Sequence, residues 1–372
     1  MRNNKYSDLK IVGFPEKLQS FREGRITPPI YVRVKPINKC NHACRWCVYK
    51  ADRRSDAGGQ RAEVGGENME VIASDMHLDM AESDVLPRAK MLEVLDDFEI
   101  MGVKAVTYSG GGEPLLHPNI VEFMRHTLFC GIDLSIITNG QLLTGERAEA
   151  LAYAKWVRVS MDYTTPAQMA HSRVVPERLF DQVLDNLQTF ARAKRPGCDL
   201  GVNFIVHRDN CNGLVDFALR LRDLGVENVR FSPMYLPGFE AYHAPIKEMV
   251  EAQLREIQRV VCTDWFSVNS TYDLHNPAHS PERAYTRCFF MQTVPVVGAD
   301  QNVYACHNKA YDKTGLIGSI KDQRFITMWS SEAARTVFEQ LNPQCDCRHQ
   351  CANDLKNRHI MNLVNSAQDS FV

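Results

Sequence analysis

Cysteine is the residue type whose spacing says most about chemistry in this 372-residue chain. Eight of its 12 cysteines fall into two groups, one near each end of the sequence. The groups are Cys40, Cys44 and Cys47, and then Cys288, Cys306, Cys345, Cys347 and Cys351. In a reducing compartment, clustered cysteines indicate metal ligands or redox chemistry rather than disulfides. The isolated cysteines are expected to be small buried apolar residues: Cys130, Cys198, Cys211 and Cys262.

The first group has the spacing C-x3-C-x2-C. A structural zinc site needs four ligands, commonly in C-x2-C pairs, and only the neighbouring His42 could be proposed as the fourth here. Three thiolates on one tight loop suit instead an iron–sulfur cubane with one iron left open. An open iron can bind an exogenous ligand, which a closed electron-transfer cluster cannot do.

This loop resembles the signature of the radical S-adenosylmethionine (radical SAM) enzymes. The resemblance lies in the spacing of Cys40, Cys44 and Cys47, in Trp46 before the last cysteine, and in a predicted strand, Tyr31–Val34, just before the loop. It implies that a 4Fe–4S cluster on these cysteines binds the methionyl amine and carboxylate of SAM. The reduced cluster would then cleave SAM to methionine and a 5′-deoxyadenosyl radical.

A glycine-rich segment at the end of the second predicted strand is similar to the GGEP motif of that family. It comprises Gly111, Gly112, Glu113 and Pro114, and read alone it predicts only a turn. In the family, such glycines let the backbone approach SAM, and the resemblance implies that a backbone carbonyl and Glu113 accept hydrogen bonds from its amine. The chemistry agrees, because a bound ammonium needs acceptors and only glycine permits such close approach.

Further residues match positions of SAM contacts in the family: Asn139, Ser160, Arg173 and Asn203. The resemblance implies that Ser160 and Arg173 hold the ribose and the carboxylate of SAM, and an arginine fork can bond both carboxylate oxygens. The plainer interpretations are a helix N-cap for Ser160, a surface position for Arg173, and a turn at Asn139.

The second cysteine group is similar to the SPASM or Twitch extension of this family, which binds auxiliary 4Fe–4S clusters. The run from Asp300 to Cys306 matches the pattern D-G-x-V-Y-x-C, except that Gln301 replaces the glycine. A full SPASM module carries enough cysteines for two clusters, whereas the five here suffice for one, as in the shortened Twitch form. A structural zinc site is the alternative. The expected ligands are Cys288, Cys306 and Cys351, with either Cys345 or Cys347 as the fourth.

These motifs need a scaffold that brings strand ends together, and the sequence predicts one. Short β-branched or apolar runs alternate with helical patterns from residue 31 to residue 232. This alternation predicts a parallel sheet with helices outside it and ligands at the carboxyl ends of its strands. About six βα units are visible, and the rhythm fades from about residue 236. The expected fold is therefore α/β, a partial (β/α)6 radical SAM barrel with a small C-terminal auxiliary-cluster domain.

Four segments are expected along the chain. They are an N-terminal extension (1–30), the radical SAM core (31–235), a connecting and substrate segment (236–286) and a SPASM/Twitch-like domain (287–372). The expected strands are Tyr31–Val34, Val103–Tyr108, Ile132–Thr138, Trp156–Ser160, Leu200–Val206 and Val229–Phe231.

The charge of the chain is nearly balanced, with 43 Lys and Arg against 45 Asp and Glu and a formal net charge of −2. This balance gives no electrostatic argument for a nucleic-acid or membrane partner. No apolar run approaches the roughly 20 residues that span a bilayer, and residues 1–30 contain no secretory apolar region. A cytoplasmic protein without nucleic-acid or membrane partners is therefore expected.

The resemblance implies that a 5′-deoxyadenosyl radical abstracts a substrate hydrogen atom. An auxiliary cluster suits oxidation because it can take the second electron, so we expect dehydrogenation of a sugar, an aminocyclitol or a nucleotide-linked alcohol. Only 39 residues precede Cys40, too few for a domain that grips a leader peptide, which favours a small molecule. An electron donor such as flavodoxin or ferredoxin is expected as a partner.

Several alternatives stay open at this point. The protein could be a maturase of ribosomal peptides, a redox-neutral epimerase, lyase or decarboxylase, or a non-catalytic metal-binding protein. The residue that takes the substrate proton is undetermined, with Asp162, His207 and Tyr235 as candidates near strand ends. Substrate contacts are expected in residues 51–86 and 236–286.

Overall fold

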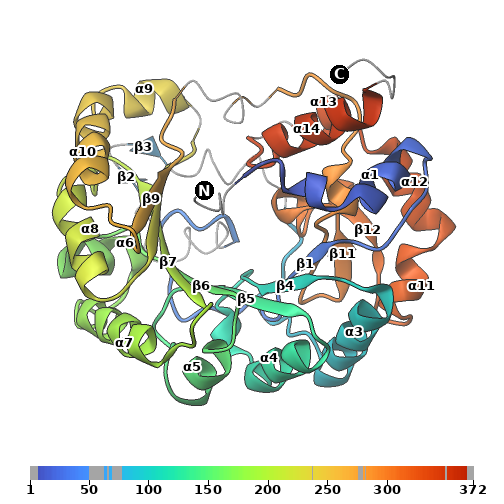
Figure 1. Ribbon diagram of the computed structural model, residues 1–372, viewed down its shortest axis with the longest axis horizontal. Helices are drawn as coiled ribbons and strands as arrows, with labels where there is room; N and C mark the ends of the chain where they lie inside the picture. The colour runs from blue at the N-terminus through green and yellow to red at the C-terminus, as the bar shows by residue number, and fades with distance from the viewer. Residues whose placement is uncertain are drawn as a thin grey trace.

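The protein is built on one curved sheet of ten strands with helices along its outer side (Figure 1). The computed structural model describes residues 7–49, 63–64, 67–68, 78–236, 238–274, 280, 282–347 and 350–366, so most of the substrate loop expected at 51–86 lies outside the described residues. The strand order is β12-β11-β10-β1-β4-β5-β6-β7-β8-β9. In this order, all neighbouring strands between β10 and β9 pair in parallel, whereas the pairs β10–β11 and β11–β12 are antiparallel.

Six consecutive strands of this sheet coincide with the six that the sequence predicts. They are β1 (Tyr31–Val34), β4 (Ala105–Tyr108), β5 (Asp133–Thr138), β6 (Trp156–Ser160), β7 (Asp199–Val206) and β8 (Asn228–Pro233). Because all six are parallel and are joined through helices, the expected α/β partial barrel is confirmed.

The helices of the barrel pack on one face of the sheet because the strands alternate. In β6, Val157 and Val159 are buried against helices, whereas Arg158 between them is only half-buried on the inner face. Helix α7 buries apolar residues such as Val183 and Leu187 in the same core. The barrel helices are α3 (Arg88–Met101), α4 (Ile120–Phe129), α5 (Gly145–Leu151), α6 (Pro166–Arg173), α7 (Leu179–Ala193), α8 (Leu214–Asp223) and α10 (Lys247–Val260).

The βα rhythm does not fade near residue 236, as the sequence suggested, but continues for one more unit. After a short helix, α9 (Phe239–His243), α10 leads into β9 (Ser267–Ser270), which pairs in parallel with β8. Strand β9 has the sequence SVNS, in which only Val268 is apolar, so it shows no apolar alternation. Pattern reasoning missed it because pairing with β8, and not side-chain propensity, makes it a strand.

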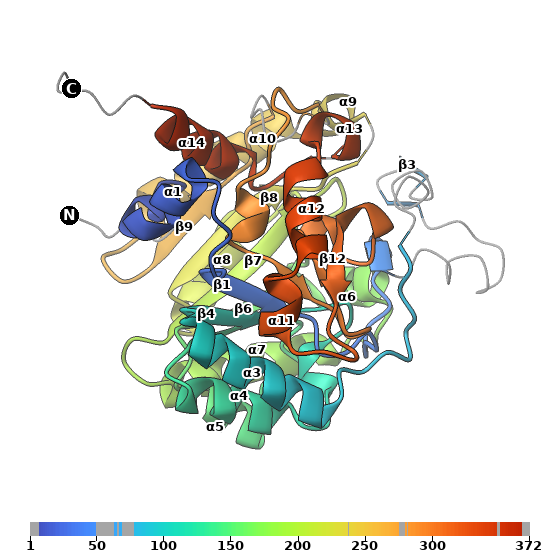
Figure 2. The ribbon, with the colours of Figure 1, turned by 90° about the vertical axis from the view of Figure 1, so that its right-hand side faces the viewer.

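The C-terminal segment extends the same sheet on its other side. Strand β10 (Val296–Val297) pairs in parallel with β1, and β11 (Asn302–Tyr304) and β12 (Leu316–Ser319) follow. Its helices are α11 (Phe325–Trp329), α12 (Glu332–Gln340), α13 (Pro343–Asp346) and α14 (Asp354–Asn365). Figures 1 and 2 show α14 beside α1 (Pro15–Arg22), where Phe21, Phe289 and Ile360 form a small core.

The remaining elements are short. They are the 3-10 helices η1 (Lys10–Gly13), η3 (Pro114–Leu116), η5 (Phe290–Gln292), η6 (His307–Lys309) and η7 (Lys313–Gly315), and a separate hairpin of β2 (Glu63–Val64) and β3 (Glu67–Asn68).

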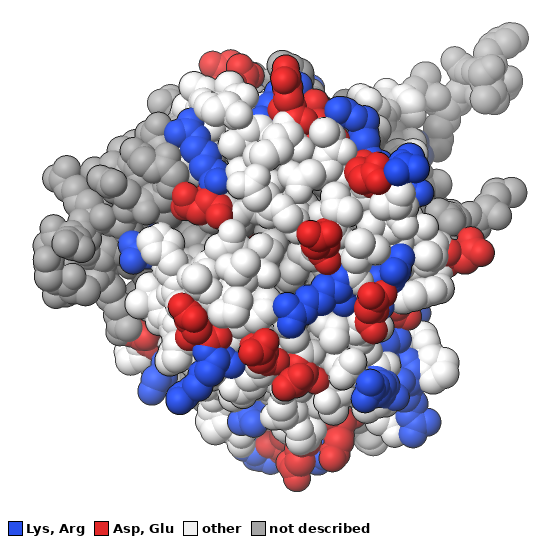
Figure 3. Space-filling model, turned by 90° about the vertical axis from the view of Figure 1, so that its left-hand side faces the viewer, with Lys and Arg blue, Asp and Glu red and all other residues white. Residues whose placement is uncertain are grey.

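The outer surface carries mixed charges. Figure 3 shows basic and acidic side chains interspersed over one face, and several pair along α10, such as Lys247 with Glu251. Among the helices of the described residues, none is long and apolar enough to cross a bilayer.

Candidate functional site

The first cysteine loop follows β1 and is held by the end of α6. The backbone amides of Ala43 and Arg45 donate to the carbonyls of Arg173 and Ser172, at 3.0 Å each. The loop also turns on itself, with the Cys47 amide 3.1 Å from the Cys44 carbonyl. All three of its cysteines are partly accessible, so their sulfurs are available to a ligand at the carboxyl ends of the strands.

The glycine-rich segment packs directly against this loop. The Gly112 amide donates to the Ile37 carbonyl and the Glu113 amide to the Lys39 carbonyl, both at 3.0 Å. A Cβ atom at Gly112 would lie 2.0 Å from the Lys39 carbonyl oxygen, and one at Gly111 would lie 2.1 Å from the Asn38 side-chain oxygen. Only glycine permits this approach, so the glycines bring two loops together here. Pro114 follows as the buried first residue of η3.

The Glu113 carboxylate is buried and accepts three internal hydrogen bonds. Oε1 accepts from the Leu115 amide at 3.1 Å and the Thr138 hydroxyl at 2.7 Å, and Oε2 accepts from the Asn139 amide at 2.8 Å. Burial raises the pKa of Glu113, whereas these donors oppose the rise. A carboxylate oxygen can accept two hydrogen bonds, so Oε2 keeps capacity for one more donor.

Asn139 links the end of β5 to the cysteine loop. Its side-chain amide donates to Asn41 at 2.7 Å, and Asn41 in turn donates to Gln141 at 2.7 Å. The turn predicted at Asn139 is present, since Gly140 has φ +82°. The turn interpretation of Asn139 is therefore confirmed, and its contact with SAM stays a prediction.

Arg173 is buried, not on the surface, and joins β6 to the cysteine loop. Its guanidinium pairs with Asp162, with Nε 2.7 Å from Oδ1, and donates to the Ser160 carbonyl at 3.1 Å. Its Nη1 lies 3.3 Å from the Cys44 sulfur. Trp46 flanks it, with its ring centroid 5.9 Å from the guanidinium carbon.

Side-chain oxygens at the ends of β4, β6 and β7 can accept hydrogen bonds from a ligand. Within the described residues, Ser109 Oγ, Asp162 Oδ2 and Asn203 Oδ1 are buried without a hydrogen-bond partner. Asn203 faces Ser160 across the β6–β7 register, so the two predicted residues are neighbours. Because a buried oxygen without a partner is costly, these acceptors fit a ligand that carries ammonium and hydroxyl groups, as SAM does.

The three candidates for the substrate base have other contacts. Asp162 is paired with Arg173, and the His207 ring lies 5.1 Å from Trp46. Burial lowers the pKa of His207 and raises that of Tyr235, whose ring stacks on Phe239 at 5.3 Å.

Lys35, which sequence reasoning missed, lies fully buried at the end of β1. Its Nζ donates to the Tyr49 hydroxyl at 2.5 Å and to the Gly110 carbonyl at 2.8 Å. Burial lowers the pKa of Lys35 to about 7. In the sequence, a single lysine after an alternating strand is typical of a surface residue. Only the alternation along β1, which places Lys35 on the same face of the sheet as Arg33, could have indicated that it points inward.

In the second cysteine group, four of the five thiols lie near enough to affect one another electrostatically. Burial raises the pKa of Cys288, and so do the neighbouring thiols of Cys306, Cys351 and Cys347. The same holds for Cys347, whose pKa is raised to about 12 by burial, Cys306 and Cys351. Cys345 is exposed, whereas Cys347 is only partly accessible. Four thiols whose anions repel one another suit a bound cationic metal group.

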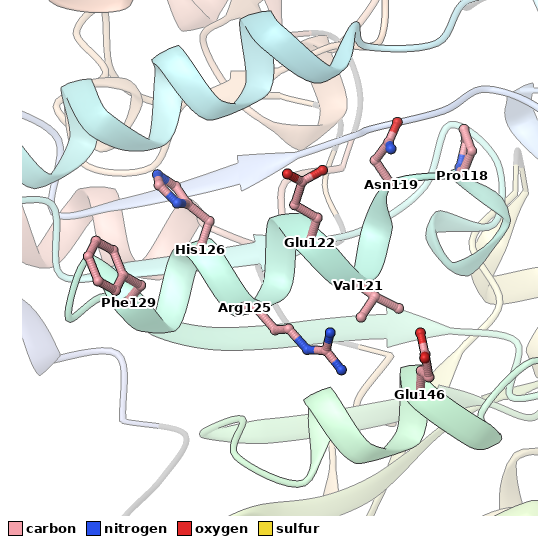
Figure 4. Close-up of a pocket in the computed structure, with 8 residues that line it drawn as sticks. All are labelled: Pro118, Asn119, Val121, Glu122, Arg125, His126, Phe129 and Glu146. Atoms are coloured by element: carbon pink, nitrogen blue, oxygen red, sulfur yellow. The ribbon is translucent and has the colours of Figure 1, made fainter.

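The isolated cysteines follow expectation in part. Cys130, Cys198 and Cys211 are buried, whereas Cys262 is partly accessible. Cys130 lies within 4.8 Å of side-chain atoms of Asp96 and His126 on the outside of the barrel. His126 also lines an open surface hollow beside α4, with Glu122, Arg125 and Glu146 (Figure 4). None of the predicted site residues lines this hollow.

Comparison with known proteins adds two family matches. Residues 34–218 match the model of the Radical SAM superfamily, and residues 288–352 match that of SPASM, an iron-sulfur cluster-binding domain. Among curated proteins, the chain is 27% identical to the PqqA peptide cyclase of Bradyrhizobium diazoefficiens, over 45% of this chain and 44% of that one. It is 25% identical to the GTP 3′,8-cyclase of Campylobacter fetus, over 46% and 44%. These matches span less than half the length of either relative.

Among solved structures, the fold is similar to that of SuiB from Streptococcus suis bound to the precursor peptide SuiA. The TM-score is 0.60 at 13% sequence identity, covering 88% of this chain and 70% of SuiB. At this identity the likeness concerns the fold alone.

Proposed function

Because this chain is a member of the radical SAM superfamily with a C-terminal SPASM iron–sulfur domain, we propose that it dehydrogenates a small molecule, such as a sugar, an aminocyclitol or a nucleotide-linked alcohol, by radical chemistry. The two domains imply SAM and 4Fe–4S clusters as its cofactors. When bound, these groups supply a 5′-deoxyadenosyl radical and an acceptor for one electron. The substrate would lose a hydrogen atom, a proton and an electron, which balances as the oxidation of an alcohol to a carbonyl.

The observation that carries the proposal is the convergence on the first cysteine loop. Gly112 and Asn139 reach this loop from the ends of β4 and β5, and Arg173 reaches it from the end of α6 and contacts Cys44. In our proposal Cys40, Cys44 and Cys47 are the ligands of the radical-generating cluster. The oxygens of Ser109, Asp162 and Asn203 would accept hydrogen bonds from SAM, and Glu113, held by its three internal donors, would accept one from the SAM amine.

The ligands proposed for the auxiliary cluster are Cys288, Cys306, Cys347 and Cys351. The electrostatic influence of these thiols on one another supports this set, and the exposure of Cys345 argues against it as a ligand. A set of four thiolates leaves the cluster without an open position, which suits electron transfer.

The assignment is tested by counting iron after anaerobic reconstitution with iron and sulfide. The wild type is expected to bind about eight irons per chain, and Cys347→Ser about four, because one cubane is lost. The triple variant of Cys40, Cys44 and Cys47 should also bind about four irons and should form no 5′-deoxyadenosine from SAM with dithionite. Cys345→Ser is the matched control and should equal the wild type.

Three results would contradict the proposal. A wild-type value near four irons that Cys347→Ser does not change would exclude the auxiliary cluster. Loss of iron in Cys345→Ser but not in Cys347→Ser would mean that Cys345, and not Cys347, is the fourth ligand of the auxiliary cluster. Zinc in place of iron would exclude the radical chemistry altogether.

A further inference from the structure

One side chain of the C-terminal domain, Tyr311, reaches the first cysteine loop. It is almost fully buried, and its ring lies 5.6 Å from that of Tyr304. Its hydroxyl donates to Asn38 Oδ1 at 2.5 Å. Burial raises the pKa of Tyr311 well above its usual value, so the hydroxyl keeps the proton that it donates. Because Asn38 stands two residues before Cys40, this hydrogen bond joins the C-terminal domain to the start of the cysteine loop.

Asn38 in turn lies against the glycine-rich segment. A Cβ atom at Gly111 would lie 2.1 Å from Asn38 Oδ1 and 3.2 Å from the Tyr311 hydroxyl oxygen, so both oxygens lie directly over this glycine. The Asn38 side-chain amide donates to the Ala81 carbonyl at 2.9 Å, which fixes the way the side chain is turned. Without the Tyr311 hydroxyl, Oδ1 would lose a hydrogen bond at a fully buried position, and such a loss is costly. The hydroxyl therefore helps to hold Asn38 where Gly111 packs on it.

The backbone of Tyr311 is held in a conformation that its residue type disfavours. Its φ is +68°, in the left-handed region that an aromatic residue rarely adopts. Such strain persists only where the surroundings impose it, and it is concentrated at binding and active sites. The Tyr311 carbonyl accepts from the Asp79 amide at 2.8 Å, and Lys313 pairs with Asp79 at 2.9 Å. A glycine would adopt this conformation without strain, so the contacts of the Tyr311 side chain must offset its cost.

Lys35 holds the other side of the glycine-rich segment and lies over the same ring. Its Nζ donates to the Gly110 carbonyl at 2.8 Å and lies 5.5 Å from the centroid of the Tyr311 ring. The ring of Tyr49, two residues after Cys47, meets the Tyr311 ring edge-on at 6.1 Å. The contacts of Tyr311 therefore connect both ends of the cysteine loop with the glycine-rich segment.

We propose that Tyr311 is a positioning residue for SAM: through Asn38 its hydroxyl fixes Gly111 and the start of the cysteine loop, so that the C-terminal domain takes part in SAM binding. This rests on the proposed function, since it concerns the SAM site of that enzyme. The effect of Tyr311 passes through Asn38, which touches both motifs. The C-terminal domain thus serves SAM binding as well as electron transfer.

The test is equilibrium dialysis of SAM against the anaerobically reconstituted protein with both clusters in place. Tyr311→Phe removes only the hydroxyl, and we expect its Kd for SAM to rise by about two- to tenfold, as for the loss of one buried hydrogen bond. Formation of 5′-deoxyadenosine with dithionite should show the same rise in the KM for SAM, with a smaller change in kcat. Iron per chain should equal that of the wild type.

Tyr304→Phe is the matched control. It removes a hydroxyl from the neighbouring ring, but that hydroxyl donates to Asp300 at 2.5 Å and not to Asn38. Each variant loses one hydrogen-bonded hydroxyl, so both should have similar urea midpoints, and only Tyr311→Phe should bind SAM more weakly. A double-mutant cycle tests the route through Asn38. In an Asn38→Ala background, Tyr311→Phe should weaken SAM binding no further, because the partner of the hydroxyl is already absent.

Three results would overturn the proposal. They are wild-type affinity for SAM in Tyr311→Phe, equal weakening in Tyr304→Phe, and effects of Tyr311→Phe and Asn38→Ala that simply add. Loss of iron in Tyr311→Phe would likewise overturn it, since the residue would then be needed for the fold of the domain alone. A wild type that binds SAM while Tyr311→Phe binds it equally well contradicts this inference and leaves the radical assignment standing. A wild type that does not bind SAM contradicts the proposed function itself.

Discussion

Individual residues at this site do several jobs at once, and this limits what the sequence can reveal. The motif Gly111–Pro114 could be recognised from the sequence because its spacing is specific, and its glycines pack against the cysteine loop. The sequence predicts Arg173 as a residue that binds a carboxylate. Its pairing with Asp162 and its contact with Cys44 could not be predicted, because they depend on the fold. The burial of Lys35 could not be predicted at all, because the elements packed around a lone lysine decide whether it is buried.

Lys35 makes the stability of the protein depend on pH. Its folded-state pKa is about 7, below the usual value of 10.5, so the unfolded chain binds the extra proton between these limits. Stability therefore rises with pH through this window, and below about pH 7 the full penalty of the buried charge is present. We expect Lys35→Met to remove this dependence, so that the difference from wild type changes by about 1.4 kcal/mol per pH unit between about 7 and 10.

Guanidinium denaturation at a series of pH values in this window measures that difference. Only its slope is diagnostic, because the substitution also removes the hydrogen bonds to Tyr49 and Gly110. Lys321→Met, at an exposed position, is the control and should match the wild type at pH 7. A difference that does not vary with pH would show that Lys35 stays charged when folded.

At the scale of elements, regular alternation was predictable and pairing partners were not. The strands β1 and β4 to β8 have apolar runs long enough to be recognised, whereas β9 is polar and β10 has only two residues. Both exist because a neighbouring strand offers them hydrogen bonds. The choice between Cys345 and Cys347 could not be predicted for the same reason. Only one residue separates them, and the fold decides which of them lies near the other thiols.

The docking of the glycine-rich segment on the cysteine loop gives an element-scale prediction. In Gly112→Ala the new methyl group would meet the Lys39 backbone, which cannot rotate away, so the two loops must separate. We expect a loss of stability of roughly 1–3 kcal/mol and a loss of iron from the first cluster. The urea midpoint and iron per chain measure these effects.

Gly13→Ala is the matched control for that substitution. Gly13 has no positive φ and nothing within 4 Å of an added Cβ, so its variant should keep the wild-type midpoint and iron content. Equal behaviour of the two variants would mean that the loops do not need their close approach.

At the scale of the whole molecule, the second cysteine group is joined to the barrel through the sheet itself. Strand β1 has β4 on one side and β10 on the other, and the Trp329 indole donates to the Thr27 carbonyl at 3.1 Å. Helix α14 packs on α1, so the C-terminal segment also contacts the helix that precedes β1. The strands of the core and those of the C-terminal domain thus belong to one continuous sheet.

This continuity predicts cooperative unfolding of the two parts. We expect far-UV and near-UV circular dichroism to give one coincident transition, because opening β10 would expose the edge of β1 and its ladder. Val297→Pro should lower the midpoint of that whole transition, since proline removes a donor from a strand with neighbours on both sides. Two separate transitions, with only one of them shifted by Val297→Pro, would mean that the barrel is stable without its C-terminal strands, and that β1 can serve as an edge.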